Sequence, residues 1–212
     1  MPVLNLRNSH MIVMPQSYSP SAVARRFEVI QEMVLSDKAY SIIYDKSTPF
    51  AAVIEADITL VDGQPRHRVV AKLDMIRRDK DDEIFAVRDF WQDTEALQVD
   101  GVVVDKSMQD IGLATKMYEC LVIEKGITLM SDNTHYEGGK ALWQKIARSS
   151  AHLTVYVFDT EAQVFYPYDG SRVRYDGICI PENEIWSLDP DVSRYGVILV
   201  AEDSRKHPQP AL

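Results

Sequence analysis

The sequence predicts a mixed α+β fold, with a mostly antiparallel central sheet flanked by helices and a C-terminal extension. Three observations predict it. Apolar and polar residues alternate over residues 52–60 and again over 69–75, as in half-buried strands. An apolar run at 99–104 leads through a short loop into a helical pattern that starts near Gly112. Further strand patterns follow the next helix, so helices interrupt a largely sequential sheet.

Composition bounds the function classes. The chain has 212 residues, 46% of them hydrophobic, which is enough for a sizeable core. Because 23 Lys and Arg stand against 32 Asp and Glu, the net charge of −9 repels phosphate backbones and disfavours a nucleic-acid coat protein. No apolar run approaches the roughly 20 residues of a membrane span, and the first ten residues lack the apolar core of a signal peptide. We expect a cytoplasmic protein that binds no membrane and has no structural disulfide.

The N-terminal part is expected to form one helix and a hairpin. Ser19 and Pro20 are typical of a helix start, and apolar residues recur every three or four positions up to Val34, which predicts a helix over 20–36. Asp62-Gly63 lies between the two alternating segments, so they should pair as an antiparallel hairpin.

The remaining elements follow in order. The patterns predict strands at 84–91, 99–104, 127–130, 153–158, 164–168 and 195–201, and helices from Gly112 to Gly126 and over 137–149. We expect one domain, with residues 1–169 forming its body and 170–212 a C-terminal elaboration. The loop-rich segment 170–194 would suit a lid, a dimer arm or an acceptor-binding flap.

Residues 102–115 carry the most specific chemical signal. They form a strand, a short loop and the start of a helix, and Gln109 to Ala114 fit the pattern Gln/Arg-x-x-Gly-x-Gly/Ala. Unpaired backbone N–H groups at a helix N-terminus, at the positive end of the helix dipole, can bind a pyrophosphate. Small residues at Gly112 and Ala114 allow close approach to the backbone. The glycine patterns of Rossmann and P-loop sites are absent from the sequence.

This segment resembles the coenzyme A signature of the GNAT superfamily of N-acetyltransferases, and the order of elements is also similar. The resemblance is strongest over about residues 96–148. It implies acetyl-CoA as co-substrate, with Val102, Val103 and Val104 pairing with the pantetheine arm like an added strand. It also implies a pyrophosphate site made of Gln109, Asp110, Ile111, Gly112, Leu113, Ala114 and Thr115.

A second cluster, residues 130–143, extends the resemblance. Members of such families often contact the coenzyme through an asparagine after the following strand, and Asn133 matches this place. They also often protonate the departing thiolate with a helix tyrosine, but Trp143 occupies that place, and Tyr136 could serve instead. The cluster resembles acetyltransferase-like proteins of phages and prophages, and faintly the DNA-modification proteins of the Mom type.

Direct acyl transfer requires a neutral amine, whereas a lysine-like amine has a pKa of about 10.4, so a base is needed. The candidate bases are Asp100, Asp105 and Asp132, and the candidate proton donors to the thiolate are Tyr136 and Ser131. A backbone N–H near Val104 would stabilise the oxyanion. The alternative role for each carboxylate is a helix cap or a solvated turn, and Asp132 could cap the helix that follows.

Other readings of the cluster are weaker. Ser131, Asp132 and His135 together suggest a hydrolase, but a catalytic serine usually lies on a sharp glycine-flanked turn. The histidines and cysteines show no metal-ligand spacing, so no metal is expected.

The expected function is therefore direct acyl transfer to an amine in a ternary complex. The acceptor would be a protein lysine, a protein N-terminus or a small amine, with nucleic acid less favoured by the net charge. A homodimer is compatible with the sequence. The alternative is a non-catalytic protein of this fold that binds or inhibits a host protein, or, less favoured, nucleobase modification of the Mom type.

Overall fold

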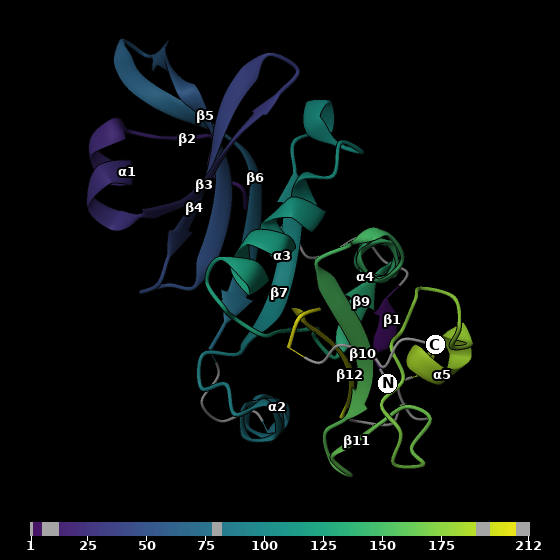
Figure 1. Ribbon diagram of the computed structural model, residues 1–212. Helices are drawn as coiled ribbons and strands as arrows, with labels where there is room; N and C mark the ends of the chain where they lie inside the picture. Colours follow the sequence, from purple (N-terminus) through teal and green to yellow (C-terminus); the bar gives the residue numbers. More distant parts are fainter. Residues whose placement is uncertain (1, 6–12, 78–81, 190–195, 207–212) are drawn as a thin grey trace. The chain divides into compact units, whose positions relative to one another are not determined.

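The computed structural model describes residues 2–5, 13–77, 82–189 and 196–206 (Figure 1). They form a mixed α+β fold in which most of the strand pairs are antiparallel, as predicted. The chain divides into two compact units: unit 1 comprises residues 1–9, 77–99 and 121–212, and unit 2 comprises 10–76 and 100–120. Strand β7 (Leu97–Val104) and helix α3 (Leu113–Ile123) each contribute residues to both units.

Unit 2 is built on a sheet with the strand order β7-β6-β5-β4-β3, with β2 also paired to β6. Its elements are β2 (Ser17–Tyr18), α1 (Pro20–Arg26), β3 (Glu28–Leu35), β4 (Lys38–Asp45), β5 (Phe50–Val61), β6 (Gln64–Ile76), the second part of β7, a 3-10 turn (Lys106–Met108) and the first part of α3. Consecutive strands from β3 to β6 pair antiparallel.

Helices cover both faces of this sheet. On one face, Ile43, Ile54 and Val69 form a core cluster against which Val23 and Phe27 pack, so α1 covers this side. On the other face, the Cys120 thiol of α3 donates a hydrogen bond to Gln31 of β3. Gln31 lies opposite Ile42, and the side chains of Ile42 and Ile43 alternate across β4. The part of α3 in unit 2 therefore lies on the face opposite α1.

Unit 1 has the strand order β11-β10-β12-β8-β7. Its elements are β1 (Val3–Asn5), α2 (Asp82–Trp91), the first part of β7, β8 (Leu129–Met130), β9 (Thr134–Tyr136), α4 (Glu137–Ser149), β10 (Leu153–Asp159), β11 (Val164–Phe165), α5 (Glu182–Ile185) and β12 (Val197–Asp203). Strand β8 runs parallel to β7 and antiparallel to β12, while β1 and β9 form a separate parallel pair.

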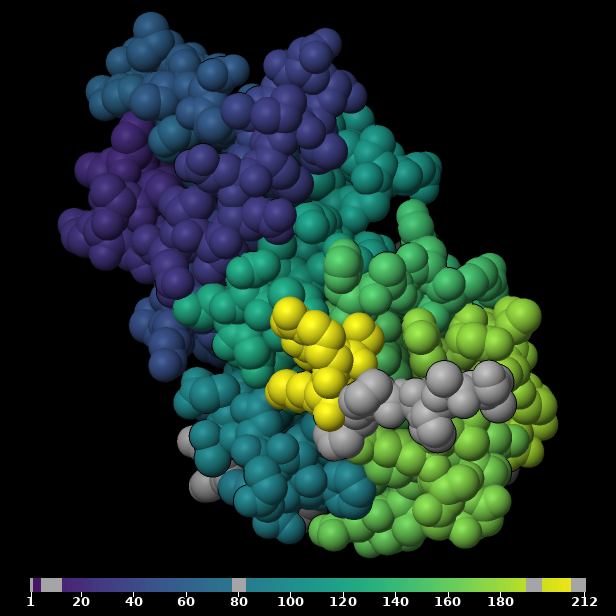
Figure 2. Space-filling view, viewed as in Figure 1, coloured from purple at the N-terminus to yellow at the C-terminus, as the bar shows by residue number. Residues whose placement is uncertain are grey.

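The core of unit 1 is aromatic and packs against α2. Ile84 and Val87 of α2 are fully buried in one cluster with Phe158 and Ile198. Helix α2 lies beside β11 (Figures 1 and 2), and the ring centroids of Phe90 and Phe165 are 5.2 Å apart. Through this packing, α2, which precedes β7 in the sequence, contacts β11 at the end of the unit 1 sheet.

The predicted helix over 20–36 is wrong in its second half. Helix α1 ends at Arg26, Phe27 is extended, and residues 28–35 form β3. Ser36 and Asp37, with φ of 49° and 65°, make the two-residue turn into β4. Because residues 28–35 are rich in β-branched and large apolar side chains, pairing along β4 outweighs their helical spacing.

The predicted strand at 84–91 is also wrong, because the segment forms α2. Ile84 and Val87 are three positions apart and both fully buried, and Trp91 packs on the same cluster four positions later. Spacings of three and four place side chains on one face of a helix and on both faces of a strand.

Other elements are confirmed with shifted ends. The hairpin turn lies at Asp62 and Gly63, both with positive φ, and the elements β7, α3, α4 and β10 follow the predicted patterns. The strand predicted at 164–168 ends at Phe165. The last strand starts at Val197, after a turn at Gly196, and residue 195 of the predicted strand lies outside the described residues. Residues 170–189 and 196–206 belong to unit 1, and the boundary at 169/170 stays a prediction. Among the described helices, none combines the length and the apolar composition needed to cross a bilayer.

Candidate functional site

The strand, loop and helix predicted for residues 102–115 are present in this order. Val102 to Val104 form the end of β7, Asp105 caps the 3-10 turn, and α3 starts at Leu113. The loop adopts left-handed backbone at two positions, Asp110 (φ 65°) and Gly112 (φ 87°). Aspartate tolerates the left-handed region better than most residues, and glycine adopts it at little cost, which is consistent with glycine at position 112.

The backbone at the start of α3 is accessible. A Cβ built on Gly112 meets no heavy atom within 4 Å, and residues 109–111 are exposed. The first turn of α3 carries no acidic side chain, and its first intrahelical hydrogen bond runs from the Lys116 N–H to the Gly112 carbonyl (3.0 Å). The first backbone N–H groups of a helix have no partner within the helix and are the groups that bind anions at helix N-termini.

The three valines lie on an end strand of the unit 2 sheet. Residues 101–104 are all half-buried, and in unit 2 the strand β7 has β6 as its one neighbour among the described strands. The parallel pairing of β7 with β8 joins Leu97 to Leu129 and Gln98 to Met130, before the valines begin. Taken with unit 2 alone, the valines offer backbone groups along one edge, to which an extended ligand can pair.

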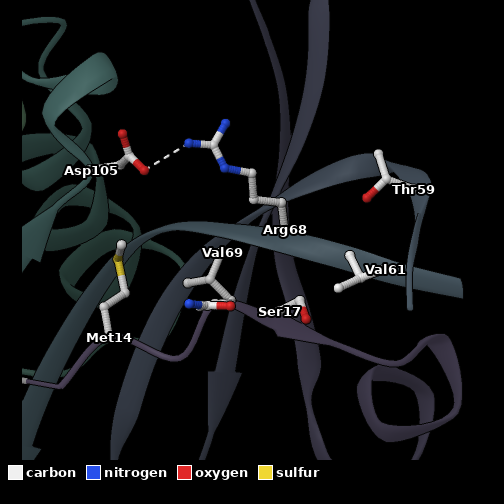
Figure 3. A pocket seen from close by; sticks show the side chains of 8 residues that line it. Met14, Ser17, Thr59, Val61, Arg68, Val69 and Asp105 are labelled. Atoms are coloured by element: carbon white, nitrogen blue, oxygen red, sulfur yellow. Dashed lines mark hydrogen bonds and ion pairs between the residues drawn. The ribbon is translucent and has the colours of Figure 1, made fainter. Parts of the chain in front are cut away.

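Asp105, a predicted base, lies at the end of β7 next to an open pocket of about 300 Å³. Figure 3 shows its carboxylate facing Arg68 of β6, with Thr59 and Val61 of β5 and Ser17 of β2 around the same space. Asp105 Oδ2 accepts a hydrogen bond from Arg68 Nη2 at 2.7 Å. The other oxygen, Oδ1, accepts from the Ser107 N–H and hydroxyl at 2.9 and 2.6 Å.

These contacts fix the charge of Asp105. Hydrogen bonds from Ser107, followed by those from Arg68, hold the pKa of the Asp105 carboxyl below its usual value. A carboxylate with a lowered pKa is a weaker proton acceptor. The geometry therefore gives Asp105 a structural function as the cap of the turn that leads into the loop.

The second predicted cluster lies in unit 1, at the end of β8. Ser131 is fully buried, and its hydroxyl donates to the Asp132 carbonyl (3.1 Å) and accepts from the Leu199 N–H (3.1 Å). Asp132 Oδ1 accepts from the Asn133 N–H (2.7 Å) and from Gln98 Nε2 (3.3 Å). The Asn133 amide donates to Glu83 Oε1 of α2 (2.6 Å). These residues form one polar group beside the start of β7.

Tyr136 and Trp143 lie on the next elements of unit 1. Tyr136 is the half-buried last residue of β9 and the N-cap position of α4, while Trp143 is buried on α4 beside Ile146. The helix position at which the resemblance implies a proton-donating tyrosine is therefore part of the core. Tyr136, the alternative proton donor, lies at the junction of β9 and α4.

The predicted site residues therefore fall into two sets, and the members of each set lie together within one unit. Unit 2 holds residues 102–115, and unit 1 holds Ser131, Asp132, Asn133 and Tyr136, while Asp100 is an exposed residue of β7. The sequence reasoning missed Gln98, Glu83 and Arg68. Of these three, only Gln98 stands out in the sequence, because it is a polar residue at the start of an otherwise apolar strand; in the structure it is buried.

His135 predicts a pH dependence of stability. Its Nδ1 accepts from Trp186 Nε1 (2.9 Å), and burial lowers its pKa to about 4, with the Asp132 carbonyl opposing in part. An unfolded histidine has a pKa of about 6.5 and binds a proton that the folded one rejects, so stability should fall as the pH drops from about 6.5 towards 4. At about pH 5 we expect a loss of about 2 kcal/mol relative to about pH 7.

Urea unfolding of the parent and of His135→Asn, which keeps an acceptor for Trp186, measures this loss. The variant should lack this component of the pH dependence, whereas substitution of the exposed His152 by Asn should retain it. Equal slopes of stability against pH in all three proteins would contradict the assignment.

Comparison with known proteins gives no relative. No family model matches the chain, and neither the curated proteins nor the solved structures include a significant match.

Proposed function

We propose that the protein is an acyl-CoA-dependent N-acyltransferase of the GNAT type, with acetyl-CoA as the default donor. The observation that carries the proposal is the β7–α3 segment: a valine strand at a sheet end, followed by a left-handed turn at Gly112 and a helix whose first turn has no acidic side chain. The order of elements, from the antiparallel strands through β7, α3, β8 and α4 to the closing strands, supports it.

Backbone groups would do most of the coenzyme binding. The edge of Val102 to Val104 would pair with the amides of the pantetheine arm, as an added strand does. The turn from Gln109 to Ala114 and the first turn of α3 would hold the pyrophosphate with backbone N–H groups and the helix dipole. Since these donors are main-chain groups, glutamine in place of the commoner arginine at position 109 is compatible with binding.

The reaction forms one bond and breaks one. The acceptor amine nitrogen attacks the thioester carbonyl carbon, the carbon–sulfur bond breaks, and an amide and a thiol result. The amine loses a proton to a base and the departing sulfur gains a proton from an acid, and Asp132 and Tyr136 stay the predicted candidates for these two roles. Both oxygens of Asp105, another candidate base, already accept hydrogen bonds from Ser107 and Arg68.

Thermal unfolding in the presence of acetyl-CoA tests the proposal. At about 100 times Kd the ligand should stabilise the protein by about 2.7 kcal/mol, which raises Tm by about 5–10 °C for a chain of this size. NADH and ATP serve as controls, because each carries an adenine nucleotide without pantetheine. An unchanged Tm with acetyl-CoA would overturn the proposal and favour a non-catalytic binding protein.

A further inference from the structure

We propose that the pocket beside Asp105 binds a free α-amino acid with an apolar side chain. The pocket has a volume of about 300 Å³ and is lined by the segment that leads into β2, by β2 itself, by the β5–β6 hairpin and by the residue after β7. All of these segments belong to unit 2. The site therefore needs no contact between the two units, and it is independent of the proposed function.

Two opposite charges lie side by side in this pocket. Arg68 Nη2 donates to Asp105 Oδ2 at 2.7 Å, and Figure 3 shows the two groups facing each other. Both side chains are open to solvent, with 45% and 24% of their surface exposed. Because its pKa is held below the usual value, the Asp105 carboxyl is ionised at neutral pH. The pocket thus presents one positive and one negative group to a ligand.

Both charged groups keep hydrogen-bonding capacity. A guanidinium has five N–H donors, and within the described part of the chain Arg68 directs one to Asp105 and one, at 3.4 Å, to Glu55 Oε1. Asp105 Oδ1 caps the turn, whereas Oδ2 accepts from Arg68 and has a second lone pair. The other donors of Arg68 and this lone pair can bind a ligand.

The balance of charge determines the kind of ligand. One guanidinium faces two carboxylates, Asp105 and Glu55, so the group as a whole is negative. It would repel a phosphate, while a simple cation would meet the guanidinium of Arg68. A zwitterion satisfies both charges, because its carboxylate can accept from Arg68 while its ammonium donates to Asp105. An α-amino acid carries these two groups on one carbon atom, which suits protein charges 2.7 Å apart.

The rest of the pocket is suited to an apolar side chain. Met14, Val61 and Val69 contribute to the lining, and Val61 of the hairpin is 41% exposed. Figure 3 shows these three side chains around the same space as the charged pair. An apolar group bound here would remove apolar surface from water on both partners. We therefore expect an amino acid such as leucine, rather than one with a charged side chain.

Binding of L-leucine and two analogues to the full chain tests the proposal by calorimetry. 3-Methylbutylamine is leucine without the carboxylate, and 4-methylpentanoate is leucine without the ammonium. We expect leucine to bind with a Kd of about 1 mM or below. Each analogue should bind about tenfold more weakly or worse, because one charge-assisted hydrogen bond is lost.

Two variants remove the protein charges one at a time. In Arg68→Met, leucine should lose its advantage over 3-methylbutylamine, because the partner of the ligand carboxylate is gone. In Asp105→Asn, leucine should lose its advantage over 4-methylpentanoate, because the partner of the ammonium is neutral. Arg66→Met is the matched control: Arg66 lies two positions away on β6 and outside the pocket lining, so this variant should match the parent.

The parent alone can overturn the proposal, whatever the folding of the variants. A parent that binds leucine no more tightly than its analogues, or binds none of the three, contradicts an amino-acid site. Among folded variants, an unchanged preference for leucine in both Arg68→Met and Asp105→Asn also contradicts it. Since no acetyl-CoA is present, these outcomes are distinct from a failure of the proposed function.

Discussion

Replacing Arg172 by Ala should destabilise the protein by about 3–5 kcal/mol, because it removes the positive charge that faces a buried carboxylate. Glu202 of β12 has a fully buried side chain, and its Oε1 accepts from Arg172 Nη2 at 2.7 Å. The guanidinium also lies over the rings of Tyr156 and Phe165, at 4.4 and 4.6 Å from their centroids. Removing the arginine thus removes both the counter-charge and the ring contacts.

The neighbouring ion pair provides the control. Arg205 pairs with Asp203 of the same strand at 2.7 Å, but the arginine side chain is 74% exposed, so Arg205→Ala should cost no more than about 1 kcal/mol. Adding Glu202→Gln to Arg172→Ala removes the buried charge and should recover part of the lost stability. Urea unfolding measures all four proteins. Equal losses from Arg172→Ala and Arg205→Ala would contradict the role given to the buried pair.

The Arg172 contacts also give a function to part of the loop-rich segment. Residues 170–194 carry few sequence signals, yet Arg172 is anchored in the core of unit 1 and Trp186 is bonded to His135. Trp91 Nε1 donates to Glu202 Oε2 at 2.6 Å, across 111 positions of the chain. Such contacts depend on tertiary structure, so local patterns contain no signal for them.

The local patterns were reliable where backbone geometry decides the structure. The strand, short loop and helix of residues 102–115 were predicted, because strand patterns and helix starts depend on nearby residues. The same patterns failed over 28–35, where apolar residues had helical spacing by coincidence. Ile30 is half-buried there and Val34 is 70% exposed, so that spacing marks no buried helix face.

The candidate site was predictable to a similar degree. Residues that act through the backbone, such as Gly112, could be named from the motif. The contacts of Asp132 could not, because Gln98 is 34 positions away and meets it through the pairing of β7 with β8. Likewise, the capping and ion-pair contacts that lower the pKa of Asp105 come in part from Arg68 on β6.

Replacing Ala114 by Asp should weaken acetyl-CoA binding by about 10²-fold or more. Ala114 is the second residue of α3, where an acidic side chain is compatible with the helix but would face the bound pyrophosphate. Two like charges about 4 Å apart near a protein surface repel by about 4 kcal/mol, and about 1.4 kcal/mol is a factor of ten in Kd. Ala114→Asp is preferable to Gly112→Asp, because φ of 87° at Gly112 would strain any other residue.

Calorimetric titration of acetyl-CoA into the parent, Ala114→Asp and the charge-matched control Ala151→Asp tests the coenzyme site most directly. Ala151 is an exposed residue between α4 and β10, in unit 1. The parent and Ala151→Asp should bind with the same Kd, and Ala114→Asp should bind at least about 10²-fold more weakly with an unchanged circular dichroism spectrum. Equal affinities in all three proteins, or no binding to the parent, would contradict a coenzyme site at residues 102–115.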